Sequence, residues 1–366
     1  HETLLSIAAD YQATFDVWSV ADKPFQFLAA VLEYARWAKE GDAFVSYIPL
    51  SLDGTNSGIQ HYSGISKSIT EASLVNLVPT TSMADIYKMN AERVVGELEK
   101  TKDDIEPFNV NWDQSRTRFQ LAQAYGYSSK APGMSGQFME DFCKPLQRKV
   151  SYGQLDAHPL GDSDRSQFEA ARFMGQVSYE AIKGTLPDTT AIMDYLQSVA
   201  KVISTENKAI KWTTPSGFPI VQEYRMTKPQ TVEISLFDRK LGERSRTRVG
   251  LRLDKDNINV QKSMNSIAPN FIHGSGDAAH MHLTICYLLD QGLAEDFVMI
   301  HDSFSISGDV WDLFDGVRES FISMYDVPCS LQKFEDEVRQ QLNDPSTELC
   351  PIPPKGNLDI SQVRDS

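Results

Sequence analysis

Residues 53–61 read DGTNSGIQH and residues 301–304 read HDSF, and these two stretches decide the fold. Each follows an apolar run typical of a β-strand. An acidic side chain at the end of a buried strand costs free energy unless a cation or hydrogen bonds satisfy it. If the fold brings the two strands together, Asp53 and Asp302 form a pair of carboxylates. Such a pair is typical of two-metal phosphoryl-transfer sites, in which the ions lie about 3.5–4 Å apart. Taken singly, each acid also fits an ordinary turn at a strand end.

The composition is that of a globular enzyme with a large core. The chain has 366 residues, of which 41% are hydrophobic and 23% charged, and this length allows two or three domains or one large domain with an insertion. The four cysteines form no CxxC pair, so we expect no disulfide framework and no zinc site, as in a reducing cytoplasm. No apolar run approaches the length of a membrane span. The chain begins with His1, which favours a longer parent or a trimmed terminus.

The charge balance alone argues against a nucleic-acid-binding protein. The net charge is −15, whereas such proteins usually carry a basic surface. A nucleic-acid substrate would still agree with this negative charge under two conditions. The catalytic acids would bind metal ions, and a basic partner would supply most of the phosphate contacts. Lysine and arginine gather at residues 116–118, 147–149 and 239–252, and we interpret the last two groups as solvated surface.

The periodicity of apolar residues predicts an α+β, mostly helical chain. Helices are expected over residues 2–40 with a break at 22–24, then over 57–66, 85–98, 168–183, 190–203, 280–289 and 311–325. Strands are expected over residues 46–52, 220–224, 231–237 and 246–253, and on both sides of a turn within 297–307.

Four sequence blocks in one order resemble a known family, the bacteriophage-type single-subunit RNA polymerases, which include the mitochondrial enzyme. They are residues 53–61, 212–219 (WTTPSGFP), 266–273 (SIAPNFIH) and 301–304. The likeness extends from residues 22–25 to 354–358. It implies a right-hand architecture with palm and fingers. Residues 1–81 would be the first part of the palm, 82–280 the fingers and 281–366 the second part of the palm.

The resemblance assigns roles to five positions around the two acidic motifs. Asp53 and Asp302 match the two catalytic aspartates, which hold two Mg²⁺ ions, and Gly54 would present its backbone carbonyl to a metal. His301 matches a position beside the primer 3′ end. His280 matches a histidine that contacts the ribose, with one inserted residue nearby. A surface histidine at a helix start is the alternative for His280.

The fingers motif is irregular. The family carries an arginine, a lysine and a Tyr-Gly pair on one helix, where the cations bind the triphosphate and the tyrosine senses the sugar. If the family motif is aligned without gaps backward from residues 139–141, Tyr127 takes the place of the sugar-sensing tyrosine. If the motif is aligned on its Tyr-Gly pair, Tyr125 takes that place. We favour Tyr127 but leave both open. Neither register supplies the lysine, so we expect Arg116 or Arg118 to replace it, since a guanidinium keeps the charge.

The resemblance also implies substrates and partners. These are a DNA template, an RNA product and ribonucleoside triphosphates, in the cytoplasm of an infected bacterium if a phage encodes the chain. The family's amino-terminal domain and thumb are not in this sequence. We therefore expect a second polypeptide to supply them, as in a known split phage enzyme, or this chain to be a fragment.

Three other functions fit parts of the sequence. A related palm-type DNA polymerase would share the His-Asp turn, but it usually carries a bulky acid after the first aspartate. The small residues 54–58 leave room for a 2′-hydroxyl instead. A non-catalytic nucleic-acid-binding subunit derived from a polymerase would explain the irregular fingers motif. A divalent-metal nuclease would explain the two acids but not the motif with tyrosine and arginine.

Overall fold

The computed structural model describes residues 1–100, 130–161, 163–238, 242–300 and 302–366. Two compact units share these residues. The first unit comprises His1–Asp53 and Thr284–Val317, and the second comprises Gly54–Leu283 and Arg318–Ser366. The predicted α+β, mostly helical class is confirmed. The predicted palm and fingers boundaries at residues 81 and 280 remain predictions.

Three helices open the first unit. They are α1 (Glu2–Ala9), α2 (Phe15–Trp18) and α3 (Pro24–Glu40), and a 3₁₀ turn η1 (Gly41–Ala43) follows. Ile7, Trp18 and Val31 form their small core. The predicted break before residue 24 is confirmed, because Pro24 occupies the first turn of α3, where its missing N–H costs nothing. The predicted continuous helix before it is wrong, because α1 ends at Ala9 and α2 begins only at Phe15.

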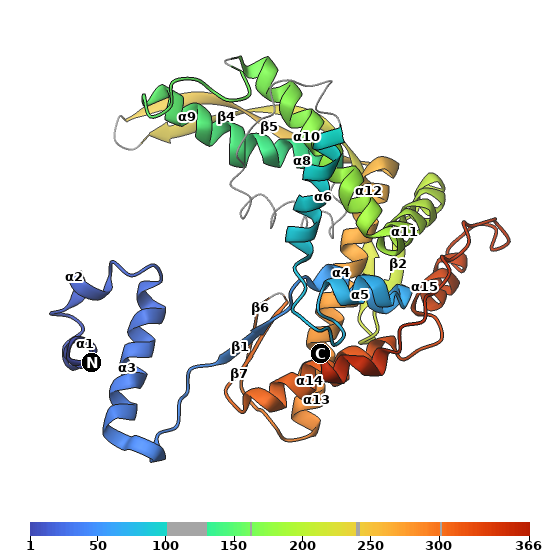
Figure 1. Ribbon diagram of the computed structural model, residues 1–366. Helices are drawn as coiled ribbons and strands as arrows, with labels where there is room; N and C mark the ends of the chain where they lie inside the picture. The colour runs from blue at the N-terminus through green and yellow to red at the C-terminus, as the bar shows by residue number, and fades with distance from the viewer. Residues whose placement is uncertain (101–129, 162, 239–241, 301) are drawn as a thin grey trace. The chain divides into compact units, whose positions relative to one another are not determined.

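A three-stranded antiparallel sheet also belongs to the first unit. Its strands are β1 (Leu50–Asp53), β6 (Phe297–Ile300) and β7 (Ser303–Ile306), in the order β1-β7-β6 (Figure 1). The predicted strand–turn–strand within residues 297–307 is confirmed. The strand predicted over residues 46–52 is shorter, because β7 pairs only with residues 50–53.

The second unit is mostly helical. Its helices begin with α4 (Ser57–Ser66), α5 (Ile69–Leu74), α6 (Ile86–Lys100), α8 (Ala131–Phe138), α9 (Lys144–Ser151), α10 (Asp164–Thr185) and α11 (Pro187–Thr205). They continue with α12 (Val260–Phe271), α15 (Ser330–Arg339), the π-helical segments η2 (Met139–Cys143) and η3 (Ile272–Ala278), and the 3₁₀ helix η4 (Ile360–Asp365). Helices α13 (Ala279–Asp290) and α14 (Val310–Tyr325) each have residues in both units.

One large core holds the second unit together. Helix α11 runs through it, with Ile192, Tyr195 and Ile203 almost completely buried. Burying apolar side chains of this size stabilises a fold by roughly 1.5–3 kcal/mol each. Asn56 caps α4 by accepting a hydrogen bond from the Ile59 N–H at 3.2 Å, which fixes where the helix begins.

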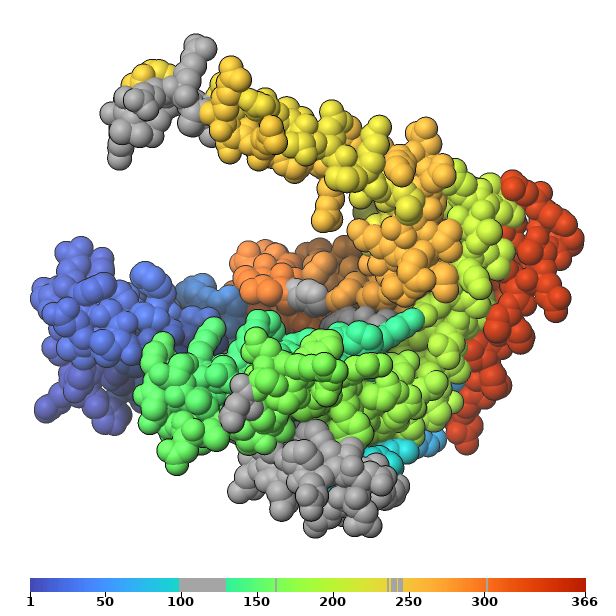
Figure 2. Space-filling model, turned by 90° about the horizontal axis from the view of Figure 1, so that it is seen from above, coloured from blue at the N-terminus to red at the C-terminus, as the bar shows by residue number. Residues whose placement is uncertain are grey.

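Two antiparallel hairpins belong to the second unit. The short one pairs β2 (Ile210–Thr213) with β3 (Pro219–Gln222), and the long one pairs β4 (Arg225–Asp238) with β5 (Glu243–Ile258). Figure 2 shows the long hairpin, in yellow to orange, as a narrow arm.

Directly paired residues of the long hairpin lie on the same face, and successive residues alternate between faces. One face is mainly apolar and carries the pairs Val232–Val249 and Gln230–Leu251. The other carries Glu233–Arg248, Ser235–Arg246 and Pro229–Arg252. The basic group at residues 239–252 therefore includes arginines that share one face of a two-stranded ribbon.

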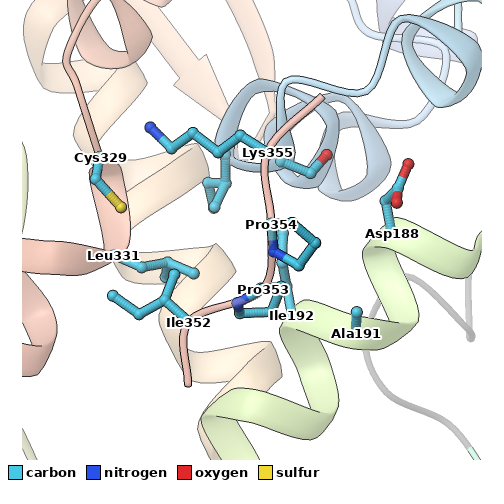
Figure 3. Close-up of a pocket in the computed structure, with 11 residues that line it drawn as sticks. Asp188, Ala191, Ile192, Cys329, Leu331, Ile352, Pro353, Pro354 and Lys355 are labelled. Atoms are coloured by element: carbon cyan, nitrogen blue, oxygen red, sulfur yellow. The ribbon is translucent and has the colours of Figure 1, made fainter. Parts of the chain in front are cut away.

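The C-terminal segment lies against the end of α4. The N–H groups of Gly356 and Leu358 donate to the carbonyl oxygens of Ser66 (2.8 Å) and Lys67 (2.9 Å). A Cβ at Gly356 would lie 2.3 Å from the Lys67 carbonyl oxygen, so only glycine fits there. Upstream, residues 352–355 enclose a cavity of about 80 Å³ with α11 and α15 (Figure 3).

Within the described residues, no helix has both the length and the apolar character that a membrane span requires.

Candidate active site

The strand register brings the two acidic motifs together. β1 and β7 are antiparallel, and Asp53, the last residue of β1, pairs with Ser303, the first residue of β7. Ile300 pairs with the same Ser303 from β6, so Asp302 lies in the turn between β6 and β7. Both acids therefore lie at one end of the sheet.

Backbone geometry limits the separation of the two aspartates. Opposite Cα atoms in antiparallel strands lie about 4.5–5.5 Å apart, and consecutive Cα atoms lie about 3.8 Å apart. The Cα atoms of Asp53 and Asp302 are therefore no more than about 9 Å apart, a span that two carboxylates sharing a pair of ions can bridge. The Asp53 side chain is exposed and that of Asp302 half-buried, so both are accessible to a ligand.

Serine hydroxyls join the strands on the face that carries Asp53. The Ser51 Oγ lies 2.9 Å from the Ser303 Oγ and 2.8 Å from the Ser305 Oγ. Since residues two apart on a strand share a face, Ser51 and Asp53 project from the same side. On the opposite face of the pair, Phe304 of β7 is buried. Sequence reasoning missed these serines, although the alternation of polar and apolar residues in both strands was a usable signal.

The donor set around this end of the sheet suits Mg²⁺. Carboxylate oxygens are the ligands that Mg²⁺ prefers, and the ion usually keeps waters and substrate phosphates in its remaining positions. In the part of the chain that the structure describes, no three His, Cys, Asp or Glu side chains are grouped to hold a metal. Asp53 and Asp302 would therefore supply part of the coordination, with the carbonyl of Gly54 as a predicted further ligand.

The turn after Asp53 is fixed from within the second unit. The Tyr87 hydroxyl donates to the carbonyl oxygen of Thr55 at 3.0 Å, and the Asn76 Nδ2 donates to the Thr55 Oγ1 at 3.1 Å. Gly54 and the two residues after it thus lead into α4 along a path that side chains hold in place.

His280 lies near the start of α13 and is buried, with 6% of its surface exposed. Its ring packs edge-on against those of His61, with centroids 5.6 Å apart, and Phe321, with centroids 5.5 Å apart. The alternative of a surface histidine is therefore wrong, because two aromatic rings pack against His280 and almost all of its surface is buried. The predicted ribose contact of His280 stays a prediction.

A buried polar cluster adjoins His280. The Asp277 carboxylate lies between two imidazoles, with its Oδ1 at 3.3 Å from the His61 Nε2 and its Oδ2 at 3.2 Å from the His273 Nδ1. On the far side of its ring, the His61 Nδ1 is 2.8 Å from the Tyr325 hydroxyl. Sequence reasoning quoted His61 within a motif, but it assigned no role to His61 or to Asp277.

The segment before His280 is a π-helix, η3. A π-turn accommodates one extra residue within a continuous helix, and such turns are frequent at functional sites. A π-helix at this place can accommodate the inserted residue that the resemblance implies near His280, and the insertion stays a prediction. The block at residues 212–219 packs onto the same segment, since the Trp212 Nε1 donates to the Ser275 Oγ at 2.9 Å.

Five predicted site residues lie outside the described residues: Arg116, Arg118, Tyr125, Tyr127 and His301. The choice between Tyr125 and Tyr127 therefore stays open. The positions used to count back to Tyr127, residues 139–141, belong to the π-helical segment η2.

Comparison with known proteins identifies one family. The sequence model of the family described as DNA-dependent RNA polymerase matches residues 1–349. T7 RNA polymerase from Escherichia phage T7 is 29% identical, over 100% of this chain and 44% of its own length. The DNA-directed RNA polymerase of Enterobacteria phage T3 is 30% identical, over 95% and 43%.

An organellar relative shows the same likeness. The mitochondrial DNA-directed RNA polymerase 1 of Nicotiana sylvestris is 28% identical, over 95% of this chain and 33% of its own length. The chain thus spans less than half the length of the relatives it matches.

Proposed function

This chain belongs to the DNA-dependent RNA polymerase family of phage and organellar type, and we propose that it carries the catalytic centre of such an enzyme. The reaction would be template-directed addition of ribonucleotides to an RNA 3′ end in the cytoplasm of the host cell. The observation that supports this most is the pairing of Asp53 with Ser303, which puts both candidate catalytic acids at one end of a sheet.

Asp53 and Asp302 would hold two Mg²⁺ ions through their carboxylate oxygens, with the carbonyl of Gly54 as a further ligand. When bound, the ions favour ionisation of the attacking 3′-hydroxyl and offset charge on the triphosphate and the leaving pyrophosphate. The serine contacts between β1 and β7 support the register, which keeps the two aspartates at the same end of the sheet. Such fixed geometry matters because a catalytic group displaced by about 1 Å can lose roughly 100-fold in rate.

Residues other than the metal ligands would select the nucleotide. His280, with Tyr125 or Tyr127, would contact the ribose, and Arg116 or Arg118 would bind the phosphates. The small residues that follow Asp53 would leave space for a 2′-hydroxyl, as a ribonucleotide substrate requires.

Polypeptide outside this sequence would complete the enzyme. The relatives are more than twice as long as the part that this chain matches, so template loading and promoter recognition would need further domains. We propose a second polypeptide in this role; the remainder of a longer chain is the other possibility. Identifying the proteins that co-purify with tagged chain from its native host distinguishes the two.

The test is extension of an RNA primer annealed to a DNA template, using that co-purified preparation. We expect extension with ribonucleotides and little with deoxynucleotides. Asp302→Asn should abolish extension, and Asp315→Asn, which changes an exposed acid of the same unit, should not. Preferential use of deoxynucleotides would instead identify a DNA polymerase. Full activity of Asp302→Asn would contradict the metal assignment.

A further inference from the structure

The Asp277 carboxylate is a buried charge held between two histidines. Its side chain is 5% exposed. Burial alone would raise its pKa, but the hydrogen bond from His273 and the contact with His61 outweigh burial and lower the pKa below its usual value. A buried carboxylate of this kind is costly unless it is paired, so losing either histidine would leave one of its two oxygens without its partner.

The orientation of the His61 ring is set from both sides. The Asp277 carboxylate can only accept a hydrogen bond, so the proton of a neutral His61 imidazole lies on Nε2, which faces the Asp277 Oδ1. Burial raises the pKa of Tyr325, so its hydroxyl keeps a proton that it can donate to the His61 Nδ1. That Oδ1 makes no well-aligned hydrogen bond among the described residues, so its contact with His61 is chiefly electrostatic.

At two glycines, the backbone approaches the rings of His61 and Tyr325 closely. A Cβ at Gly276 would lie 2.9 Å from ring carbons of His61, and a Cβ at Gly64 would lie 2.7 Å from the Tyr325 ring. Both distances are shorter than real Cβ contacts. The backbone of η3 therefore lies directly against the His61 ring and that of α4 against the Tyr325 ring, so neither ring can move toward the helix it contacts.

The His61 ring forms part of the surface on which His280 rests. His61 stacks on Phe321 with centroids 5.3 Å apart, and His280 meets both rings edge-on. Asp277 lies three residues before His280, at the end of η3. The Asp277 carboxylate can thus influence His280 in two ways. Asp277 lies in the helical segment that leads to His280, and it also contacts His61, on whose ring His280 packs.

We propose that Asp277, His61 and Tyr325 are positioning residues that hold His280 in place and thereby set the selection of ribo- over deoxyribonucleotides. They do not touch the substrate; they act through His280. This inference rests on the proposed polymerase function. It goes beyond that function because it assigns sugar selectivity to a buried cluster.

The test compares kcat and KM for a ribonucleotide and the matching deoxynucleotide in primer extension by the co-purified enzyme. We expect Asp277→Asn to lower the ribo-to-deoxy ratio of kcat/KM by about tenfold, mainly through a higher KM for the ribonucleotide. Tyr325→Phe keeps the ring and loses only the hydroxyl, so we expect a shift of about threefold in the same direction.

Tyr195→Phe is the matched control. Tyr195 is also buried, and its hydroxyl also makes one side-chain hydrogen bond, to the Glu335 Oε2 at 2.8 Å. A merely structural loss would affect Tyr195→Phe and Tyr325→Phe alike and leave the ratio unchanged in both. If Asp277→Asn does not fold, Tyr325→Phe decides the question.

The outcomes separate the two proposals. No extension by the wild-type enzyme would contradict the proposed function itself. Extension by the wild type, with the wild-type ratio in folded Asp277→Asn and in Tyr325→Phe, would overturn the positioning role alone. Imidazole ¹⁵N shifts provide a second readout, since loss of the Tyr325 hydroxyl should change the signal of the His61 Nδ1.

Discussion

Asp53 lies directly opposite Ser303 in the paired strands β1 and β7, and Ser303 is the residue that follows Asp302. Two acids from distant parts of the sequence therefore meet through a register of four residue pairs. A slip of one residue would turn the Asp53 side chain to the opposite face of the sheet. Whatever stabilises this register also stabilises the candidate metal site.

Ser51→Ala should weaken that register. The Ser51 hydroxyl contacts the hydroxyls of both Ser303 and Ser305, and its loss should cost about 1 kcal/mol of unfolding free energy. We also expect a higher Mg²⁺ concentration for half-maximal extension. Urea denaturation and a Mg²⁺ titration measure the two effects. Ser6→Ala, at an exposed position of the same unit, should change neither; equal effects of both substitutions would refute this role of Ser51.

Glu71→Gln should change how stability depends on pH. Burial raises the pKa of Glu71 to about 7, although hydrogen bonds from Thr189 and Asp188 oppose the shift. Because the folded state then binds more protons than the unfolded state, the wild type should lose stability as pH rises from about 4.5 to 7. The loss should amount to roughly 3 kcal/mol at most.

Denaturation at several pH values measures this loss. Glutamine keeps an acceptor for the Asp188 and Thr189 N–H groups, so the variant should lack the slope while remaining folded. Glu92→Gln, at a largely exposed position, should retain the wild-type slope. A flat wild-type profile would mean that Glu71 is ionised throughout this pH range.

Gly356→Ala should destabilise the second unit. The new Cβ would lie 2.3 Å from the Lys67 carbonyl oxygen, which is backbone and cannot rotate away. Overpacking of this kind typically costs about 1–3 kcal/mol. Gly136→Ala is the control, because no atom lies within 4 Å of its Cβ and alanine favours the helix there. Thermal unfolding of both variants provides the comparison, and an unchanged midpoint for Gly356→Ala would show that the C-terminal segment is not held as described.

The sequence predicted most of what depends on local pattern. The break before α3, the turn at Asp302 and the pairing of two acids follow from proline chemistry and strand periodicity. The expected burial at the strand ends is wrong, because Asp53 is exposed and Asp302 is half-buried. The long hairpin was harder, since Pro229 and the acids near residue 255 interrupt the strand pattern. Pairing across the ribbon nevertheless extends from Arg225 to Ile258.

The polar cluster could not have been predicted in this way. His61, Asp277 and Tyr325 come from three segments, and each occupies a position where an ordinary buried or capping residue would also fit. Only packing shows that the carboxylate lies between two imidazoles and that Tyr325 completes the arrangement. The residues 116–127, which carry the expected phosphate and sugar contacts, lie outside the described structure, so their predicted roles stay predictions.

The most direct test of the account is a count of bound metal ions. Mn²⁺ would replace Mg²⁺, and electron paramagnetic resonance would count the ions bound to enzyme held with primer, template and a non-reactive ribonucleotide analogue. We predict two ions in the wild type and in Asp315→Asn, and fewer in Asp53→Asn and in Asp302→Asn. Two tightly bound ions in both aspartate variants would contradict the claim that the end of this sheet is the metal site.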